Sequence, residues 1–210
     1  MTTEVIPLFA TPLYRSQVSV DLALQALVRH CEFQPFSSGN GLCTEDHHLL
    51  DQQAFAKLRR EILEHVHTYT RDVLSVADHI EFYMTNSWAT CHQPGHHSQR
   101  HQHSNSLISG IVYIDVDQHS GQLQFFKPDN FANLWPTAVD LDSADYNIYN
   151  SKFWELQPAN GDIVLFPSQL NHGVTHSTSR QDRYVVAFNL FARGHIGRGS
   201  DPEITSLILK

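Results

Sequence analysis

The sequence predicts a mainly β domain with N-terminal helices, in which antiparallel strands form a sandwich or a barrel. Short segments rich in β-branched and aromatic residues follow one another between residues 81 and 193, separated by turn signals. Two stretches before them carry an apolar residue at every third or fourth position. This spacing is typical of helices that cover one face of a sheet.

The length and charge of the chain restrict its class of function. With 210 residues the chain can bury one hydrophobic core, so a single structural domain is expected. The 22 acidic residues against 14 Lys and Arg give a formal charge of −8, without a basic cluster. Bulk binding of nucleic acid is therefore not expected, because phosphate backbones are bound by concentrated positive charge.

The cysteine spacing, the apolar runs and the N-terminus of the chain predict where the protein is located. Cys31, Cys43 and Cys91 have no paired spacing, which is typical of reduced thiols. No apolar run reaches the roughly 20 residues of a membrane helix, and the N-terminus lacks a signal-peptide pattern. A cytoplasmic protein without membrane association is expected, and the sequence leaves its oligomeric state open.

Residues 1–80 are expected to form an arm and helices that pack on the core. Residues 4–20 contain prolines among strand-forming residues, which favours an edge strand or an extended arm. Ser19 or Asp21 can cap the first helix, and the polar, turn-rich segment 34–48 is predicted to be a loop. The second helix is predicted over residues 50–76 by one apolar stripe: Phe55, Leu58, Ile62, Val66, Tyr69 and Val73.

Residues 81–195 are expected to form the core, and strand alternation assigns their side chains to faces. In the first predicted strand, alternation places four residues together: Phe82, Met84, Asn86 and Trp88. In the last one it separates an apolar face from a second face: Arg183, Val185, Ala187 and Asn189. The apolar face is expected against the helices, whereas the second face suits a cavity that holds a ligand.

Two segments lie outside this pattern of strands. Residues 127–150 are predicted to cross the mouth of the barrel as an insertion, either as a lid that contacts the substrate or as a packing flap. Its aromatic residues are Phe131, Trp135, Tyr146 and Tyr149. Residues 196–210 form a C-terminal tail, whose apolar end can add a strand or dock on a neighbour.

A histidine-rich segment, residues 91–115, predicts a metal site. His101 and His103 are separated by one residue, so they can project from one face of an extended strand. His172, which follows a later strand-like run, is the expected third ligand, and His176 is the alternative to it. Three imidazoles bind Fe(II), Zn, Cu or Ni and leave coordination positions open. The remaining histidines of this kind are interpreted as exposed loop residues: His92, His96, His97 and His119.

Arg183 is the second element of the predicted site. A guanidinium that faces a cavity is costly unless it is paired, and no acidic residue alternates into that face of its own strand. A carboxylate of a bound molecule would compensate it through two parallel hydrogen bonds. The alternative is an ion pair with Asp182 or another acid at a strand end.

The order of these motifs resembles the Fe(II)- and 2-oxoglutarate-dependent oxygenases, in particular a bacterial and phage group of them. The resemblance spans roughly residues 82–193 and is carried by NSWAT, HQHSNSLISGIVYI, GQLQFF, PANGDIVLFPSQLNHGV and RYVVAFNLF. It implies a double-stranded β-helix core of the jelly-roll or cupin-like kind. It also implies that oxidative decarboxylation of 2-oxoglutarate by O2 is coupled to hydroxylation of a small-molecule or peptide substrate, which the sequence does not identify.

The resemblance also implies roles for single residues. His101 and His172 correspond to iron ligands, Arg183 to the anchor of 2-oxoglutarate, and Tyr113 to a hydroxyl donor for the same carboxylate. Candidate pocket residues are Asn86, Trp88 and Asn189.

Two residues depart from the usual pattern of that superfamily. His103 stands where most members have Asp or Glu, and Val185 stands where a serine often assists the arginine. An imidazole in place of a carboxylate makes the iron site one unit more positive, which favours binding of a dianion. Asp115 or Asp162 is the alternative source of an acidic ligand.

Two other functions fit parts of the sequence. The first is a cupin-type dioxygenase or isomerase with three histidines, since Gly95 followed by His101 and His103 matches the opening of the cupin pattern. The cupin glutamate is absent, and a cupin has no need of Arg183. The second is a protein that binds metal or 2-oxoglutarate without turnover.

Overall fold

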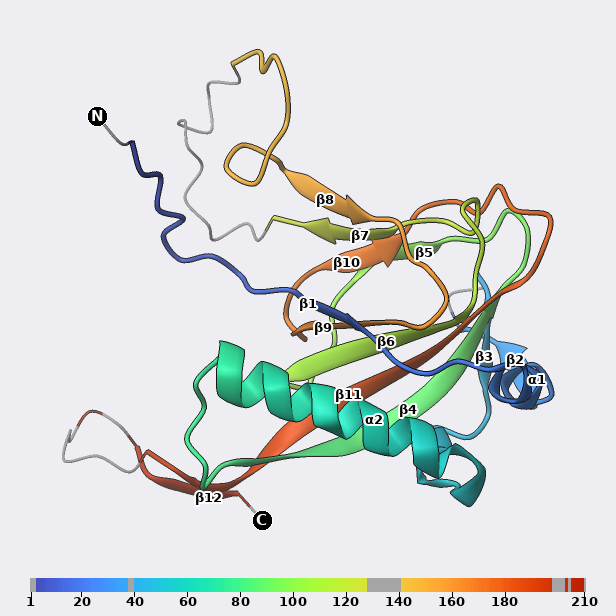
Figure 1. Ribbon diagram of the computed structural model, residues 1–210, viewed down its shortest axis with the longest axis horizontal. Helices are drawn as coiled ribbons and strands as arrows, with labels where there is room; N and C mark the ends of the chain where they lie inside the picture. The colour runs from blue at the N-terminus through green and yellow to red at the C-terminus, as the bar shows by residue number, and fades with distance from the viewer. Residues whose placement is uncertain (1–2, 38–39, 128–140, 198–202, 204, 210) are drawn as a thin grey trace.

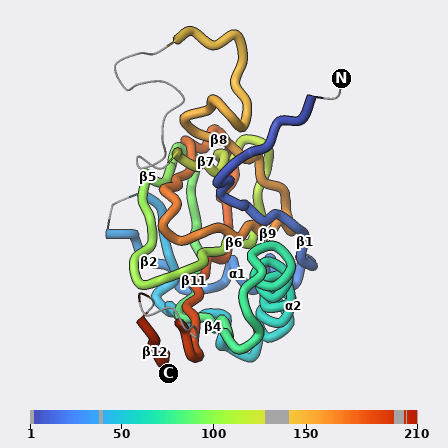
Figure 2. Tube along the Cα trace, turned by 90° about the vertical axis from the view of Figure 1, so that its left-hand side faces the viewer, coloured from blue at the N-terminus to red at the C-terminus, as the bar shows by residue number. Residues whose placement is uncertain are grey.

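The computed structural model describes residues 3–37, 40–127, 141–197, 203 and 205–209. Figure 1 shows two antiparallel sheets, one above the other, with helix α2 (Ala56–Thr68) across the outer face of the larger sheet. The view turned by 90° shows the same order of layers (Figure 2). Mainly β content with a jelly-roll core is thereby confirmed.

Within the described residues the larger sheet has eight strands. In spatial order they are β1 (Tyr14–Gln17), β9 (Asp162–Pro167), β6 (Ile108–Asp115), β11 (Arg183–Ile196), β4 (Glu81–His92), β3 (Leu42–Thr44) and β2 (Phe33–Pro35), with β12 (Leu207–Leu209) paired to β11. The predicted edge strand near the N-terminus is therefore β1, and the apolar end of the tail does add a strand. The predicted loop 34–48 was wrong in part, because β2 and β3 pair with each other inside it.

In the described part of the chain the smaller sheet has four strands, and it includes only part of the histidine-rich segment. Their order is β5 (Ser98–His101), β10 (His172–Val174), β7 (Leu123–Phe126) and β8 (Phe153–Leu156). Between the two sheets lies an apolar core to which both contribute, including Tyr113, Val164, Phe166 and Val185 from the larger sheet and Leu123 and Phe125 from the smaller. The site described below lies in this same space between the sheets.

The helices bury the outer face of the larger sheet. Helix α1 (Leu22–Arg29) is capped by Asp21, whose Oδ1 accepts a hydrogen bond from the backbone N–H of Leu24 at 2.8 Å. Short 3-10 turns (Leu49–Asp51 and Gln53–Phe55) precede α2, and a π turn (Tyr69–Val73) continues it. Val73 is 48% exposed, unlike the rest of the predicted apolar stripe, because the wider turn moves it off the buried side.

The register between β4 and β11 corrects one prediction. Asn189 pairs with Asn86 and Leu190 with Met84, so Thr85 is an extra residue in β4. The predicted common face for Phe82, Met84, Asn86 and Trp88 was therefore wrong. Phe82 and Met84 pack on the helix side, whereas Trp88 lines a cavity on the other side.

Within the described residues, no helix has both the length and the apolar character needed to cross a bilayer.

Candidate metal centre

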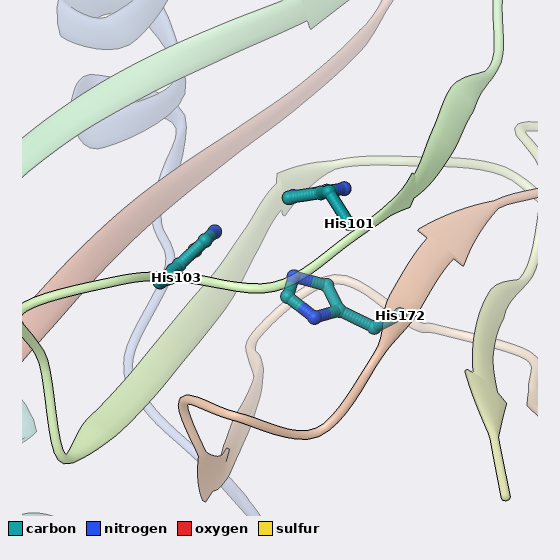
Figure 3. Close-up of side chains that lie close together, drawn as sticks. All are labelled: His101, His103 and His172. Carbon is teal, nitrogen blue, oxygen red and sulfur yellow. The ribbon is translucent and has the colours of Figure 1, made fainter. Parts of the chain in front are cut away.

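Three histidines that are distant in sequence meet between the sheets, at the smaller one. His101 is the last residue of β5 and is paired directly with His172, the first residue of β10. His103 lies two residues after His101, in the segment that leads to β6, and its ring centroid is 5.3 Å from that of His101. Figure 3 shows the three rings turned toward one another. Their candidate ligand atoms all lie within 4.8 Å of one another.

Each of the three rings has its Nδ1 atom next to a hydrogen-bond acceptor. His101 Nδ1 is 2.8 Å from the backbone oxygen of Gln99, and His172 Nδ1 is 2.9 Å from that of Leu170. His103 Nδ1 is 2.7 Å from Oδ1 of Asn189. When Nδ1 carries the proton and donates it, the Nε2 lone pair is free to bind a metal.

A buried polar network contacts the Nδ1 atom of His103 and fixes the ring. Ser109 Oγ is 2.8 Å from His103 Nδ1, donates to Asn189 Oδ1 at 2.7 Å, and is 2.9 Å from Ser168 Oγ. The backbone N–H of His103 also donates to the backbone oxygen of Ser168, at 3.0 Å. Asn189, a candidate pocket residue, thus contacts His103 directly. Its side chain fixes the orientation of the ring.

The donor set fits a divalent transition metal. Burial lowers the pKa of His103, and it lowers the pKa of His172 to about 3, so both rings are neutral at pH 7. Neutral imidazole is a suitable ligand for Fe(II) and Zn(II), and three such donors on one side leave the opposite positions for other ligands.

The three histidines line a cavity of about 270 Å³. Trp88 and Arg183 also line it, as the sequence suggested for Trp88. Of the residues that line it in the described part of the chain, none is acidic, although the whole chain has a formal charge of −8. Asn86 is not among these lining residues, and its Oδ1 accepts a hydrogen bond from Thr85 at 3.2 Å.

Arg183 is the most unusual residue in the cavity. It is 1% exposed, and its Nε and Nη2 atoms have no hydrogen-bond partner among the described residues. The hydroxyl of Tyr113 is also buried without a partner, and the Tyr113 ring centroid is 5.3 Å from Cζ of Arg183. Burial lowers the pKa of Arg183 and raises that of Tyr113. Within the described residues no acid forms an ion pair with Arg183, and Asp182 instead accepts from the hydroxyl of Tyr184 at 3.4 Å.

The two alternative acids are engaged elsewhere. Asp115 pairs with Arg29. Asp162 is 2% exposed, pairs with Arg15 at 2.5 Å and accepts from the backbone N–H of Ala159 at 2.8 Å. Neither carboxylate belongs to the histidine cluster within the described residues.

The other candidate histidines lie outside the cluster, and one of them, His92, lines the cavity. His176, the alternative ligand, stacks on His97 with ring centroids 4.2 Å apart and lies outside the cluster. His96 Nδ1 accepts from the backbone N–H of Gln93 at 3.2 Å. The interpretation of His92 as an exposed loop residue was wrong, because His92 ends β4, is 4% exposed and lines the cavity. Extending the alternation of Trp88 and Thr90 by one more step predicts this position.

The insertion is described only in part. Tyr146 and Tyr149 are 70% and 44% exposed. Phe131 and Trp135 lie outside the described residues, so the choice between lid and packing flap stays a prediction.

Acidification is expected to destabilise the metal-free protein between pH 6.5 and 3. His172 and His92 each have a pKa of about 3, because burial disfavours the charged ring; for His92 the charge of Arg183 adds to this. The unfolded chain takes up these protons near pH 6.5 and the folded chain does not, so stability falls as the pH falls through this window. At pH 5 each ring lowers the free energy of unfolding by about 2 kcal/mol relative to pH 7.5.

Urea unfolding at pH 7.5 and pH 5 measures this loss. The variant His92→Phe lacks one of the two imidazoles. Between these pH values its free energy of unfolding is expected to fall by about 2 kcal/mol less than that of the wild type. An equal loss in the variant and the wild type would show that His92 does not contribute.

Comparison with solved structures shows the same fold in several enzymes. SnoN, a non-heme alpha ketoglutarate dependent epimerase from nogalamycin biosynthesis, is 13% identical, with a TM-score of 0.61 over 95% of this chain and 91% of its own. HygX from Streptomyces hygroscopicus, solved with nickel, 2-oxoglutarate and hygromycin B, is 13% identical, with a TM-score of 0.60 over 86% and 82%. A prolyl-4-hydroxylase from Pseudomonas putida is 16% identical, with a TM-score of 0.58 over 88% and 94%. At these identities the comparison establishes the fold.

The family follows from a match of the sequence itself. The model of the family described as "Putative 2OG-Fe(II) oxygenase" matches residues 86–189. No curated protein matches the chain. The matched segment runs from β4 to β11 and contains the three histidines as well as Tyr113 and Arg183. The chain therefore belongs to the Fe(II)- and 2-oxoglutarate-dependent oxygenases.

Proposed function

We propose that this protein binds Fe(II) through His101, His103 and His172 and holds 2-oxoglutarate through Arg183. It then uses O2 to hydroxylate a small-molecule or peptide substrate. The observation that carries the proposal is one cavity lined by three imidazoles at ligand distance and by a buried guanidinium with unpartnered donors. A dicarboxylate that also reaches the metal satisfies both features.

When bound, the iron supplies the oxidative chemistry, in which 2-oxoglutarate is converted to succinate and CO2 while the substrate is oxidised. The protein supplies orientation and electrostatics. The three Nδ1 hydrogen bonds hold the imidazoles with their Nε2 atoms free. Apolar residues of both sheets line part of the cavity, including Leu123, Val174 and Val185, and reduce the contact of water with the reacting atoms.

Arg183 provides the charge that selects the cosubstrate. The Nε and Nη2 atoms form one edge of the guanidinium, so they can donate two parallel hydrogen bonds to one carboxylate. Tyr113 can donate a third. Burial penalises the charged arginine. A carboxylate that enters the cavity would pair with the guanidinium and compensate this buried charge.

A direct test measures succinate and CO2 formed from 2-oxoglutarate with Fe(II) and ascorbate, without added substrate. Slow formation of both products supports the oxygenase. A cupin-type dioxygenase or isomerase would neither bind nor consume 2-oxoglutarate. A binding protein without activity would bind it and release neither product, so either outcome would contradict the proposed reaction.

His103→Asp is the most informative ligand substitution. A carboxylate at this position restores the acid that is usual in the superfamily, so we expect the variant to keep its metal and to form succinate at a rate within about tenfold of the wild type. Its affinity for 2-oxoglutarate should fall, because the site loses one unit of positive charge. Metal content and succinate formation are compared with those of His103→Leu, which cannot bind metal at this position. Equal loss of metal in the two variants would show that His103 is not at the acid's place.

Location and organisation are part of the same proposal. The cysteines Cys31, Cys43 and Cys91 are all free, which supports a reducing, cytoplasmic location. An acidic chain without a basic cluster supports a substrate other than bulk nucleic acid. We further propose that residues 81–195 form the catalytic core, with residues 1–80 packed against it.

A further inference from the structure

Buried polar atoms without a partner are concentrated around Arg183. In the described part of the chain such side-chain atoms are Nε of Arg59, Nδ1 of His92, the hydroxyl oxygen of Tyr113, and Nε and Nη2 of Arg183. All of these except the Arg59 atom belong to three neighbouring residues. Buried groups of this kind are rare in proteins, and their concentration at one place indicates a ligand that satisfies them together.

The three residues lie on three neighbouring strands of the larger sheet, β4, β11 and β6. His92 of β4 is the direct partner of Arg183 of β11, and Tyr113 of β6 is the partner of Val185. Residues directly opposite each other in antiparallel strands project from the same face, as do residues two positions apart on one strand. His92 and Tyr113 therefore flank Arg183 on the side of the sheet that faces the cavity.

The ring of His92 is held in place by the loop glycine Gly41. A Cβ atom at Gly41 would lie 2.5 Å from Cδ2 and 2.8 Å from Nε2 of His92, so this edge of the ring packs on the backbone of the loop. Gly41 has a φ of +89°, a conformation that favours glycine and allows this close approach. The unpartnered Nδ1 atom is on the other edge of the imidazole.

The charge state of His92 suits a donor beside an arginine. Burial, and secondly the positive charge of Arg183, lowers the pKa of His92 to about 3. The ring is therefore neutral at pH 7 and carries one N–H group without adding a second positive charge to the cavity. A neutral ring of this kind can donate to an anion that the arginine attracts.

The number of unpartnered donors matches one carboxylate. A carboxylate offers about four lone-pair positions to hydrogen-bond donors. Arg183 offers Nε and Nη2, Tyr113 its hydroxyl and His92 its Nδ1. We propose that His92 donates from Nδ1 to the distal carboxylate of the cosubstrate and thereby selects 2-oxo acids that have a second carboxylate. This role rests on the proposed function, because it assumes 2-oxoglutarate in the cavity.

The test compares two cosubstrates in three forms of the protein. 2-Oxopentanoate has the carbon chain of 2-oxoglutarate with a methyl group in place of the distal carboxylate. The variants are His92→Phe, which keeps a ring against Gly41 without a donor, and His92→Asn, whose amide can place an N–H near the position of Nδ1. Binding to the Fe(II)-loaded protein is measured by calorimetry without oxygen, together with metal content and melting temperature.

We expect His92→Phe to bind 2-oxoglutarate about 10- to 100-fold more weakly, as for the loss of one hydrogen bond to a charged group. Binding of 2-oxopentanoate should change less than about threefold, since that acid has no distal carboxylate. His92→Asn should recover most of the lost affinity. Should His92→Phe fail to fold, His92→Leu is a second variant without a donor.

Three results would overturn the role of His92. They are unchanged binding of 2-oxoglutarate to His92→Phe, an equal loss for both 2-oxo acids, or no recovery in His92→Asn. A wild-type protein that does not bind 2-oxoglutarate would instead contradict the proposed function. The two failures are therefore distinguishable.

Discussion

Replacement of His172 by alanine is expected to lower the affinity for Fe(II) by more than 100-fold. His172 is 3% exposed and offers one of three ligand atoms within 4.8 Å of one another. Loss of a group that only orients a ligand typically costs 10- to 100-fold in metal affinity, so loss of a ligand itself should cost more. Metal content after anaerobic equilibrium dialysis measures the effect, and circular dichroism checks the fold.

His176→Ala is the matched control for this experiment. It removes a histidine four residues further on, which stacks on His97 outside the cluster. We expect its metal content to equal that of the wild type. If His172→Ala retains metal, or if His176→Ala loses it to the same extent, His172 is not a ligand.

Arg183→Ala is expected to leave the metal bound and to weaken 2-oxoglutarate by about 2–5 kcal/mol, the usual cost of removing one partner of a buried charge pair. This corresponds to a factor of roughly 30 to several thousand in the dissociation constant. The cause is the loss of the buried positive charge and of the Nε and Nη2 donors. Anaerobic calorimetry on the metal-loaded variant measures the change.

Arg193→Ala is the control on the same strand. Arg193 belongs to β11, but it forms a solvent-exposed ion pair with Glu81 at 2.6 Å. Its removal should leave the affinity for 2-oxoglutarate unchanged. Normal binding to Arg183→Ala, or an equal loss in Arg193→Ala, would refute the anchor.

The sequence predicted those parts of the site that depend on local periodicity. Alternation in β11 correctly placed Arg183 and Val185 toward a cavity and Val186 and Phe188 toward the helices. Together with the motif order, this predicted that His101 and His172 come together. Strand alternation follows from backbone geometry, so it is accessible without coordinates.

Other features depend on pairing between distant strands and were missed. The extra residue Thr85 in β4 moves Met84 to the helix side, and nothing in the local sequence shows where a bulge falls. The burial of His92 follows from its pairing with Arg183 and from the loop at Gly41, 51 positions earlier. Likewise, the contact of Asn189 with His103 joins residues 86 positions apart.

A crystal structure of the protein prepared without oxygen, with Fe(II) and 2-oxoglutarate, would locate both the metal and the cosubstrate. We expect iron bound by Nε2 of His101, His103 and His172, and the distal carboxylate of 2-oxoglutarate on Nε and Nη2 of Arg183. Iron held by any other set of side chains, or a carboxylate bound away from Arg183, would contradict this expectation.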